Sequence, residues 1–270
     1  MVYKQSQLES FVNGFCKVDE RIKSINHDFI MAPLMGAIPF IDTLAIINKN
    51  LNLNEVEYPP STSRFENLGE LLTDWYSNFL KENYIEGEKL KLIFIDEVVS
   101  GASAIRDHKY INKALEKIAE SKIKELYIES KREDKSRLHD YKKILTNLKR
   151  NIIYEIIGIE DSSGKEKRNE NKYYNRLKKE KIIVPIEVQK IITMDNPAYS
   201  PAQLKFSHRN KYSRPFYLPE IEGFNITPEY IGFLRDVARY VGVNPDDVNS
   251  VNQSKIFNFT KYLSDKFKTQ

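Results

Sequence analysis

The chain has 270 residues, of which 41% are hydrophobic and 30% charged, with a formal net charge of +4 and one cysteine, Cys16. This length allows a sizeable buried core, and a single cysteine excludes a disulfide framework and a cysteine-rich zinc site. No apolar run approaches the roughly 18 residues that span a bilayer, and the N-terminus has no signal-peptide-like apolar stretch, so we expect a cytoplasmic protein.

The first part of the chain alternates between helix and strand signals. A helix is predicted over residues 7–25, a strand over 28–32 and a helix over 39–48, with the glycine-containing turn Met35-Gly36-Ala37 before the second helix. A short strand over residues 56–58 enters the segment 59–64, which ends in Arg64 and which we expect to be mobile because it is rich in proline and serine. A helix is predicted over residues 66–82.

The most informative segment covers residues 89–105. An apolar run over residues 90–95 ends in the carboxylates Asp96 and Glu97, and Ser100-Gly101-Ala102-Ser103 then leads into a predicted helix. Buried parallel strands read as continuous apolar runs, and the turn after such a strand places backbone N–H groups and a helix N-terminus where an anion can sit. The segment therefore predicts a phosphate site, with carboxylates placed to accept hydrogen bonds from ribose hydroxyls or to hold a metal ion.

This segment resembles the phosphoribosyl-pyrophosphate (PRPP) motif of type I phosphoribosyltransferases. That motif has a hydrophobic strand, two acidic residues, two apolar residues, a variable position, Thr/Ser-Gly, another variable residue and Thr/Ser. The chain departs from it, because Asp96-Glu97 leaves one residue too few before Ser100-Gly101, whereas fixing Gly101 makes the pair Ile95-Asp96. Both alignments keep Asp96 in the site.

The resemblance implies a role for each matched residue. Ser100 and Ser103, with the amides of Gly101 and Ala102, would bind the 5′-phosphate, while Asp96 and Glu97 would hold the ribose hydroxyls. The Met35-Gly36 turn resembles the pyrophosphate loop of the family, and the mobile segment makes Arg64 a candidate phosphate ligand, with a plain surface arginine as the alternative. We expect a bulky side chain at Gly101 to block the anion and leave most of the stability intact.

The resemblance also implies a reaction and a cofactor. The pyrophosphate of PRPP would leave the anomeric carbon, a nitrogen nucleophile would replace it, and Mg²⁺ would bridge the pyrophosphate. The acceptor stays open. Divergent relatives of this family occur in bacterial defence systems, so an alternative is a regulator or effector that keeps the fold and binds a nucleotide or nucleic acid without transfer.

The second half of the chain continues the alternation. Helices are predicted over residues 104–121 and 137–149 and strands over 124–129 and 152–159, which indicates an α/β fold with a mostly parallel twisted sheet flanked by helices, as in type I phosphoribosyltransferases. Residues 164–180 read as an exposed charged helix or linker, and residues 182–194 as one or two strands. Residues 1–195 would form this core, and residues 196–270 an irregular hood, over 198–224, with a helical appendage that starts near Pro228 and ends in a helix over 254–267.

Several alternatives concern chemistry and partners. Asp96 with Glu129-Ser130-Lys131 has the residue types of a PD-(D/E)xK nuclease, but this hypothesis leaves the loop of residues 100–103 unexplained. The four histidines show no metal-ligand spacing, and Asp107-His108 is expected at the surface. Lysines between residues 122 and 190 indicate a solvated face or a basic patch for nucleic acid, and the helical appendage allows a homodimer or a partner protein.

Overall fold

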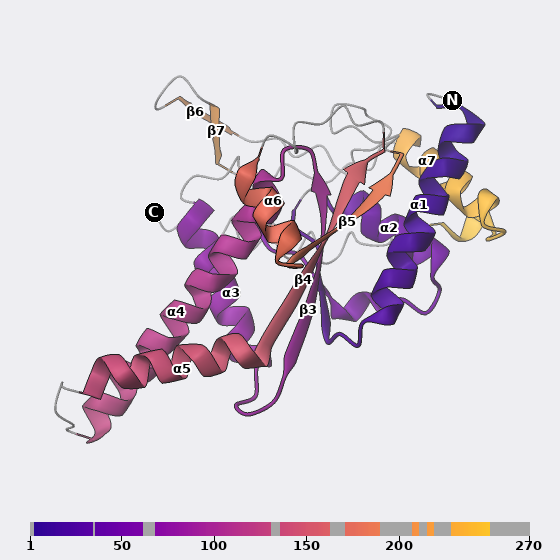
Figure 1. The fold of residues 1–270 in the computed structure, drawn as a ribbon. Helices are drawn as coiled ribbons and strands as arrows, with labels where there is room; N and C mark the ends of the chain where they lie inside the picture. The colour runs from indigo at the N-terminus through magenta and orange to yellow at the C-terminus, as the bar shows by residue number, and fades with distance from the viewer. Residues whose placement is uncertain are drawn as a thin grey trace.

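The computed structural model describes residues 3–34, 36–61, 68–130, 136–162, 171–189, 207–210, 215–218 and 228–248. Its centre is a five-stranded sheet in the order β2-β1-β3-β4-β5, in which all neighbouring strands are parallel (Figure 1). The strands are β1 (Phe29–Met31), β2 (Val56–Glu57), β3 (Leu90–Val98), β4 (Ile152–Asp161) and β5 (Ile183–Val188). The predicted α/β class with a parallel sheet is therefore confirmed.

Helices cover both faces of this sheet. One face packs against α1 (Gln5–Ser24), α2 (Ile38–Ile47) and α7 (Pro228–Tyr240), and the other against α3 (Leu68–Asn83), α4 (Ala102–Ser130), α5 (Arg137–Asn151) and α6 (Lys172–Lys179) (Figure 1). Short 3-10 helices, η1 (Leu53–Glu55) and η5 (Pro245–Asp247), precede β2 and follow α7. The fold is thus a three-layer arrangement of helices, sheet and helices.

Strand β3 contributes to the cores on both faces. Ile93 and Ile95 belong to the core beneath α1, α2 and α7, whereas Leu92 and Phe94 belong to the core beneath α3 and α4. Successive side chains of a strand point to opposite faces, so a strand buried on both sides reads as a continuous apolar run. In the part of the chain that the structure describes, no helix is long and apolar enough to cross a membrane.

Helix α4 corrects the sequence prediction, which ends a helix at residue 121 and begins a strand at residue 124. The helix continues to Ser130, and its buried residues Leu115, Ala119 and Ile123 follow each other at the four-residue spacing of one helical face. Short apolar runs between charged residues are ambiguous between helix and strand, and no glycine or proline ends the helix near residue 121. The strand beside β3 is instead β4.

The helix α7 attaches the C-terminal part of the chain to the core. Its side chains Phe233, Leu234 and Val237 are buried in the same cluster as residues of α1 and α2, and the Tyr230 hydroxyl donates to the buried Asp42 carboxylate in α2. In the region expected to be an irregular hood, β6 (Ser207–Asn210) and β7 (Pro215–Leu218) pair as an antiparallel hairpin. The remaining hood residues and the helix expected over residues 254–267 lie outside the described residues.

Candidate functional site

The strand order creates a topological switch point between β1 and β3. The sheet grows from β1 to β2 on one side and from β3 through β4 to β5 on the other, and ligands of such sheets bind outside the carboxyl ends of the strands where the order reverses. The turn with Gly36 follows β1, and Asp96, Glu97 and the loop 99–101 lie at the end of β3. A Cβ atom placed on Gly36 would lie 3.6 Å from Glu97 Oε2, so the two strand ends are in contact range.

Asp96 and Glu97 point to opposite faces of the sheet. Asp96 lies on the same face as Phe94 and Val98, beneath α3 and α4. Glu97, the next residue of the strand, points to the opposite face, toward the Gly36 turn. Asp96 is only 4% exposed, and Glu97 is half-buried. The two carboxylates that the motif presents as a pair therefore lie in different environments.

A second buried carboxylate, Asp107 of α4, lies near Asp96. Asp107 is 1% exposed, its Oδ1 accepts a hydrogen bond of 3.1 Å from the Tyr76 hydroxyl, and Ser61 also hydrogen-bonds to its carboxylate. Ser103, four residues before Asp107 on the same helix, hydrogen-bonds to Asp96. We call these residues, with Arg106, the buried acid cluster: Ser61, Tyr76, Asp96, Ser103, Arg106 and Asp107.

The acid cluster is short of hydrogen bonds. The Oδ2 atoms of both Asp96 and Asp107 are buried without a hydrogen-bond partner among the described residues. Buried polar atoms are nearly always paired in native proteins, so such exceptions indicate a proton, an ion, a water molecule or a ligand in some state of the molecule. Two such atoms lie in this one cluster.

Burial also controls the protonation of the two acids. Loss of hydration raises the pKa of Asp107 to about 7, against the lowering effects of the Ser61 hydrogen bond and of Arg106. Burial, and then the charge of Asp107, hold the pKa of Asp96 well above its usual range. Arg106, whose Nε donates to Ser61 Oγ at 3.5 Å, offsets only part of this repulsion. Both carboxyl groups therefore hold their protons to higher pH than exposed aspartates do.

The burial of Asp107 contradicts the expectation of a surface position. Its one sequence signal is the four-residue spacing from Ser103, which places both side chains on the helical face that covers β3. His108 is partly buried as well, with Nδ1 2.7 Å from the Tyr154 hydroxyl, and burial lowers the pKa of His108. Because polar and apolar residues are mixed in the first turns of this helix, composition alone does not reveal that the side of Ser103 and Asp107 is buried.

The loop of residues 100–103 leads into the start of α4. Ser100 and Ala102 are exposed, Gly101 has a φ of +74°, and the amide of Ala102 donates to Ser100 Oγ at 3.4 Å. Because α4 begins at Ala102, amides of its first turn have no acceptor within the helix. An exposed helix start of this kind favours anions.

Helix α6 holds this loop in place and corrects the expectation for Gly101. Asn171 Nδ2 donates to the backbone oxygen of Ser100 at 3.3 Å, and a Cβ atom at Gly101 would lie 2.6 Å from the Tyr174 ring. The Tyr174 hydroxyl is fixed by a hydrogen bond of 2.6 Å to Glu160 Oε1, so the ring cannot simply swing away. A bulky side chain at Gly101 would therefore disturb the fold as well as the loop.

Not all predicted site residues lie within the described part of the chain. Met35 and Arg64 lie outside the described residues, although Ser61, three residues before Arg64, belongs to the acid cluster. Among the residues that the structure describes, no three acidic, histidine or cysteine side chains form a group that could hold a metal ion. Residues 124–130 are helical, so Asp96 and Glu129 do not form the pair of neighbouring strands that the nuclease hypothesis requires.

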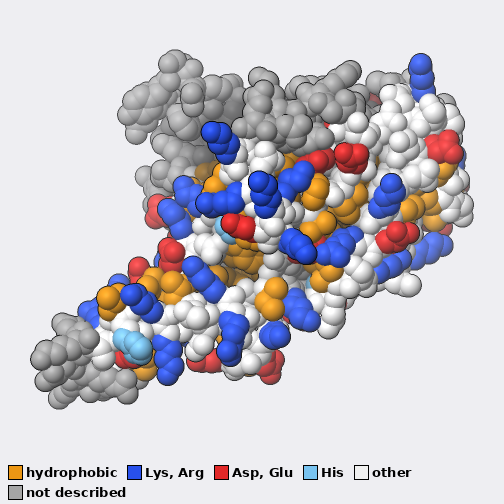
Figure 2. Space-filling model, in the orientation of Figure 1, with side chains coloured by type: hydrophobic (Ala, Val, Ile, Leu, Met, Phe, Trp, Pro, Cys, Tyr) orange, Lys and Arg blue, Asp and Glu red, His pale blue; other side chains and the backbone are white. Residues whose placement is uncertain are grey.

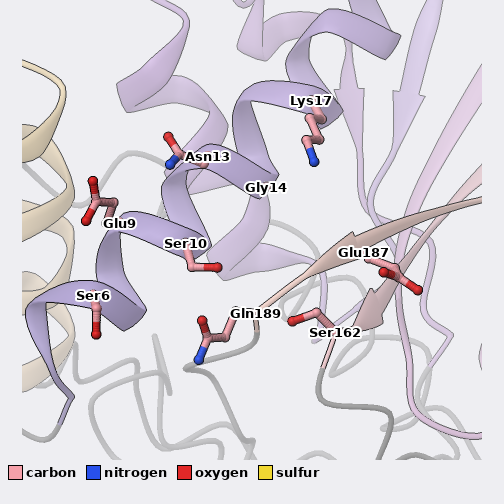
Figure 3. A pocket seen from close by; sticks show the side chains of 9 residues that line it. All are labelled: Ser6, Glu9, Ser10, Asn13, Gly14, Lys17, Ser162, Glu187 and Gln189. Atoms are coloured by element: carbon pink, nitrogen blue, oxygen red, sulfur yellow. The ribbon is translucent and has the colours of Figure 1, made fainter.

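A separate polar cavity of about 440 Å³ lies at the β4–β5 edge of the sheet (Figure 3). Ser10 of α1, Ser162 after β4 and Gln189 after β5 point toward the same space. A Cβ atom at Gly14 would lie 3.0 Å from Val188, so glycine allows α1 to pack closely beside this cavity. None of the predicted site residues lines this cavity.

Comparison with known proteins adds no identification. No protein-family model, curated protein or solved structure significantly matches the chain.

Proposed function

We propose that the chain binds PRPP or a related ribose 5-phosphate compound at the β1/β3 switch point and transfers phosphoribose to a nitrogen acceptor. The observation that carries this proposal is the position of Asp96. It is a buried carboxylate with an oxygen that has no partner among the described residues, and it lies near the end of β3, at the edge where parallel sheets bind ligands. A phosphorylated sugar has hydroxyl groups that match this carboxylate and an anionic group that matches the start of α4.

Each part of such a ligand has a counterpart at this edge. The amides at the start of α4, with Ser100, suit a 5′-phosphate, whereas Ser103 is turned toward Asp96. Asp96 suits the ribose hydroxyls. The motif alone makes Glu97 the second acid of the pair, but the second acid on the same side of the sheet as Asp96 is Asp107. Glu97 instead faces the Gly36 turn, where the resemblance expects the pyrophosphate.

Magnesium fits this arrangement only as a partner of the ligand. The described residues contain no metal cage of three or more ligating side chains, but Mg²⁺ in phosphate sites commonly uses one or two carboxylates together with the phosphates. Glu97, at the Gly36 turn, is the residue that we expect to hold it. When bound there, the ion would neutralise the negative charge that develops on the departing pyrophosphate.

The proposed chemistry is a substitution at the anomeric carbon. The acceptor nitrogen forms a bond to C1 with its lone pair, the bond from C1 to the pyrophosphate oxygen breaks with its electrons, and the acceptor releases a proton to solvent. The chain would contribute by orienting the ribose and by placing backbone N–H groups around the phosphate, so that positioning and electrostatics lower the barrier.

The raised pKa of Asp96 favours a second candidate, ligand binding without transfer. A protonated Asp96 still exchanges hydrogen bonds with ribose hydroxyls, but it gives no negative charge to stabilise a cationic sugar in the transition state. In that case the chain would be a regulator or effector that recognises the nucleotide or the phosphorylated sugar.

Two measurements test the proposal and separate the candidates. Isothermal titration of the full chain with PRPP, with and without magnesium, should give saturable heat, while ribose lacking the phosphate should give none. Release of pyrophosphate in the presence of a panel of purine and pyrimidine bases then reports transfer. Binding without pyrophosphate release favours the regulator, and the absence of binding by a folded protein rejects both candidates.

A further inference from the structure

The helices α4 and α5 form an arm that projects from the body of the molecule. Helix α4 has 29 residues and is about 44 Å long, whereas β3 beneath it has 9 residues and spans about 30 Å. The distal part of α4 and the antiparallel α5 therefore extend past the sheet, at the lower left of Figure 1. Ion pairs of Lys117 with Asp74, at 2.7 Å, and of Lys122 with Glu86, at 2.6 Å, attach the arm to the body.

The arm carries an apolar groove between its two helices. The groove has a volume of about 610 Å³ and is lined by six residues of both helices: Glu120, Ile123, Lys124, Arg137, Leu138 and Tyr141. Leu138 is 65% exposed, and Ile128, one helical turn beyond Lys124, is 79% exposed. Figure 2 shows orange side chains on this arm with blue and red ones beside them. Large apolar side chains at the end of a projecting element are typical of interaction surfaces.

The two ends of this arm groove carry opposite charges. Glu120 lies at the end nearer the body, and Lys124 lies one turn further along α4, with Arg137 at the start of α5. Glu116 lies on the same side as Glu120, because both carboxylates raise the pKa of Tyr141 after the effect of its burial. The groove is therefore acidic toward the body and basic toward the tip.

We propose that the arm groove binds the arm of a second copy of this chain, with the two arms antiparallel around a two-fold axis. In that arrangement the acidic end of each groove faces the basic end of the other. A parallel arrangement would oppose like charges. Two-fold interfaces use the same patch on both subunits, so a patch with this directional charge complements itself.

The local structure of the tip supports a preformed surface. The Tyr127 hydroxyl lies 2.7 Å from Ser136 Oγ, and the Arg137 guanidinium lies over the Tyr127 ring, 5.8 Å from its centre, so the end of α4 is tied to the start of α5. A preformed surface loses less conformational freedom on association. Nucleic acid suits the groove less well, because its lining contains Glu120 as well as the basic residues.

The test is the mass of the full chain in solution, measured by sedimentation equilibrium across about two decades of protein concentration. The wild type should be in monomer–dimer equilibrium, and Leu138→Asp should raise the dissociation constant at least about tenfold because it replaces an exposed apolar side chain of the groove by a charge. Ile85→Asp is the matched control, since Ile85 is 64% exposed, as Leu138 is 65% exposed, but lies outside the arm groove. Ile128→Glu serves as a second variant if Leu138→Asp loses its circular dichroism.

A charge exchange tests the antiparallel arrangement itself. Glu120→Lys and Lys124→Glu should each weaken the dimer, and the two changes together should restore it, because the complementary pairs are then re-formed in reverse. Raised salt should weaken the wild-type dimer. A wild type that stays monomeric at every concentration overturns the proposal. So does a dimer that Leu138→Asp and Ile128→Glu leave as stable as Ile85→Asp does.

Discussion

Two regions of the molecule bury carboxylate groups and pair them to different extents. On the face of α1, α2 and α7, Asp42 is 3% exposed and accepts a hydrogen bond from the Tyr230 hydroxyl. On the face of α3 and α4, Asp96 and Asp107 are equally buried, yet each has an oxygen without a partner among the described residues. The comparison separates an acid that joins elements of the fold from acids that the fold leaves incompletely paired.

The difference favours the acid cluster as the functional region. A buried carboxylate that is paired links elements, as Asp42 links α2 to α7, and its removal leaves a donor unsatisfied. Buried acids with raised pKa values and unpaired oxygens lower the stability of the fold, and such acids cluster at functional sites. The Tyr58 hydroxyl near Asp42 also lacks a partner among the described residues, but a neutral hydroxyl costs less to bury than a carboxylate.

The largest effect is expected at Asp42. Asp42→Ala should lower the free energy of unfolding by about 3 kcal/mol, because it leaves the buried Tyr230 hydroxyl unpaired and opens space between α2 and α7. Urea denaturation measures this value, and Asp42→Asn is the control that keeps an acceptor oxygen. A cost of Asp42→Ala close to zero would remove the structural role on which the comparison rests.

A slightly smaller effect is expected at Gly101, on the face of the acid cluster. Gly101→Ala should cost about 2–3 kcal/mol, since the side chain is disfavoured at positive φ and meets the fixed Tyr174 ring. Gly87→Ala is the matched control: Gly87 has a φ of +92°, but nothing lies within 4 Å of its Cβ position, so its cost should stay near 1 kcal/mol. Equal losses of unfolding free energy for Gly101→Ala and Gly87→Ala in urea denaturation would show that the Tyr174 ring moves aside.

The third prediction concerns the pH dependence of stability. Because the pKa of Asp107 is raised to about 7 in the folded protein and is near 4 in an unfolded chain, the folded state holds more protons between these values. The stabilising contribution of Asp107 is then fully present below about pH 4 and is lost as the pH rises toward about 7. Asp107→Asn should remove this fall, and at pH 8 it should be more stable than the wild type.

The measurement for Asp107 is the difference in unfolding free energy between wild type and Asp107→Asn at several pH values. Taking the difference cancels the titration of exposed groups that both proteins share. A difference that does not change between pH 4 and pH 8 would show that Asp107 is not a buried acid with a raised pKa.

The smallest free-energy change is expected in ligand binding. If the chain binds PRPP as proposed, Asp96→Asn should weaken binding at least about tenfold, or about 1.4 kcal/mol, while the protein stays folded. Glu97→Gln should alter the magnesium dependence more than the affinity for ribose 5-phosphate, because Glu97 faces the Gly36 turn. Titration calorimetry checks both. Unchanged affinity in Asp96→Asn would exclude this carboxylate from the site.

Local sequence patterns were sufficient to predict the α/β class and the edge of the sheet where the candidate site lies. The apolar run of residues 90–95, the loop with Gly101 and the following helix start are features of neighbouring residues, so periodicity and turn chemistry reveal them. The parallel sheet followed from the alternation of strands and helices, and one strand assignment failed, at residues 124–129, because a short apolar run fits either structure.

Tertiary contacts decided the chemistry of the site. The sequence places Asp96 beside Glu97, but the pleat of β3 turns their side chains to opposite faces, and the packing of α4 brings Asp107 to Asp96 instead. Likewise, Gly101 reads as a flexible turn residue until α6 places the Tyr174 ring against it. Burial and contacts between distant segments set both pKa values and steric limits, and these depend on how helices pack, which no local pattern encodes.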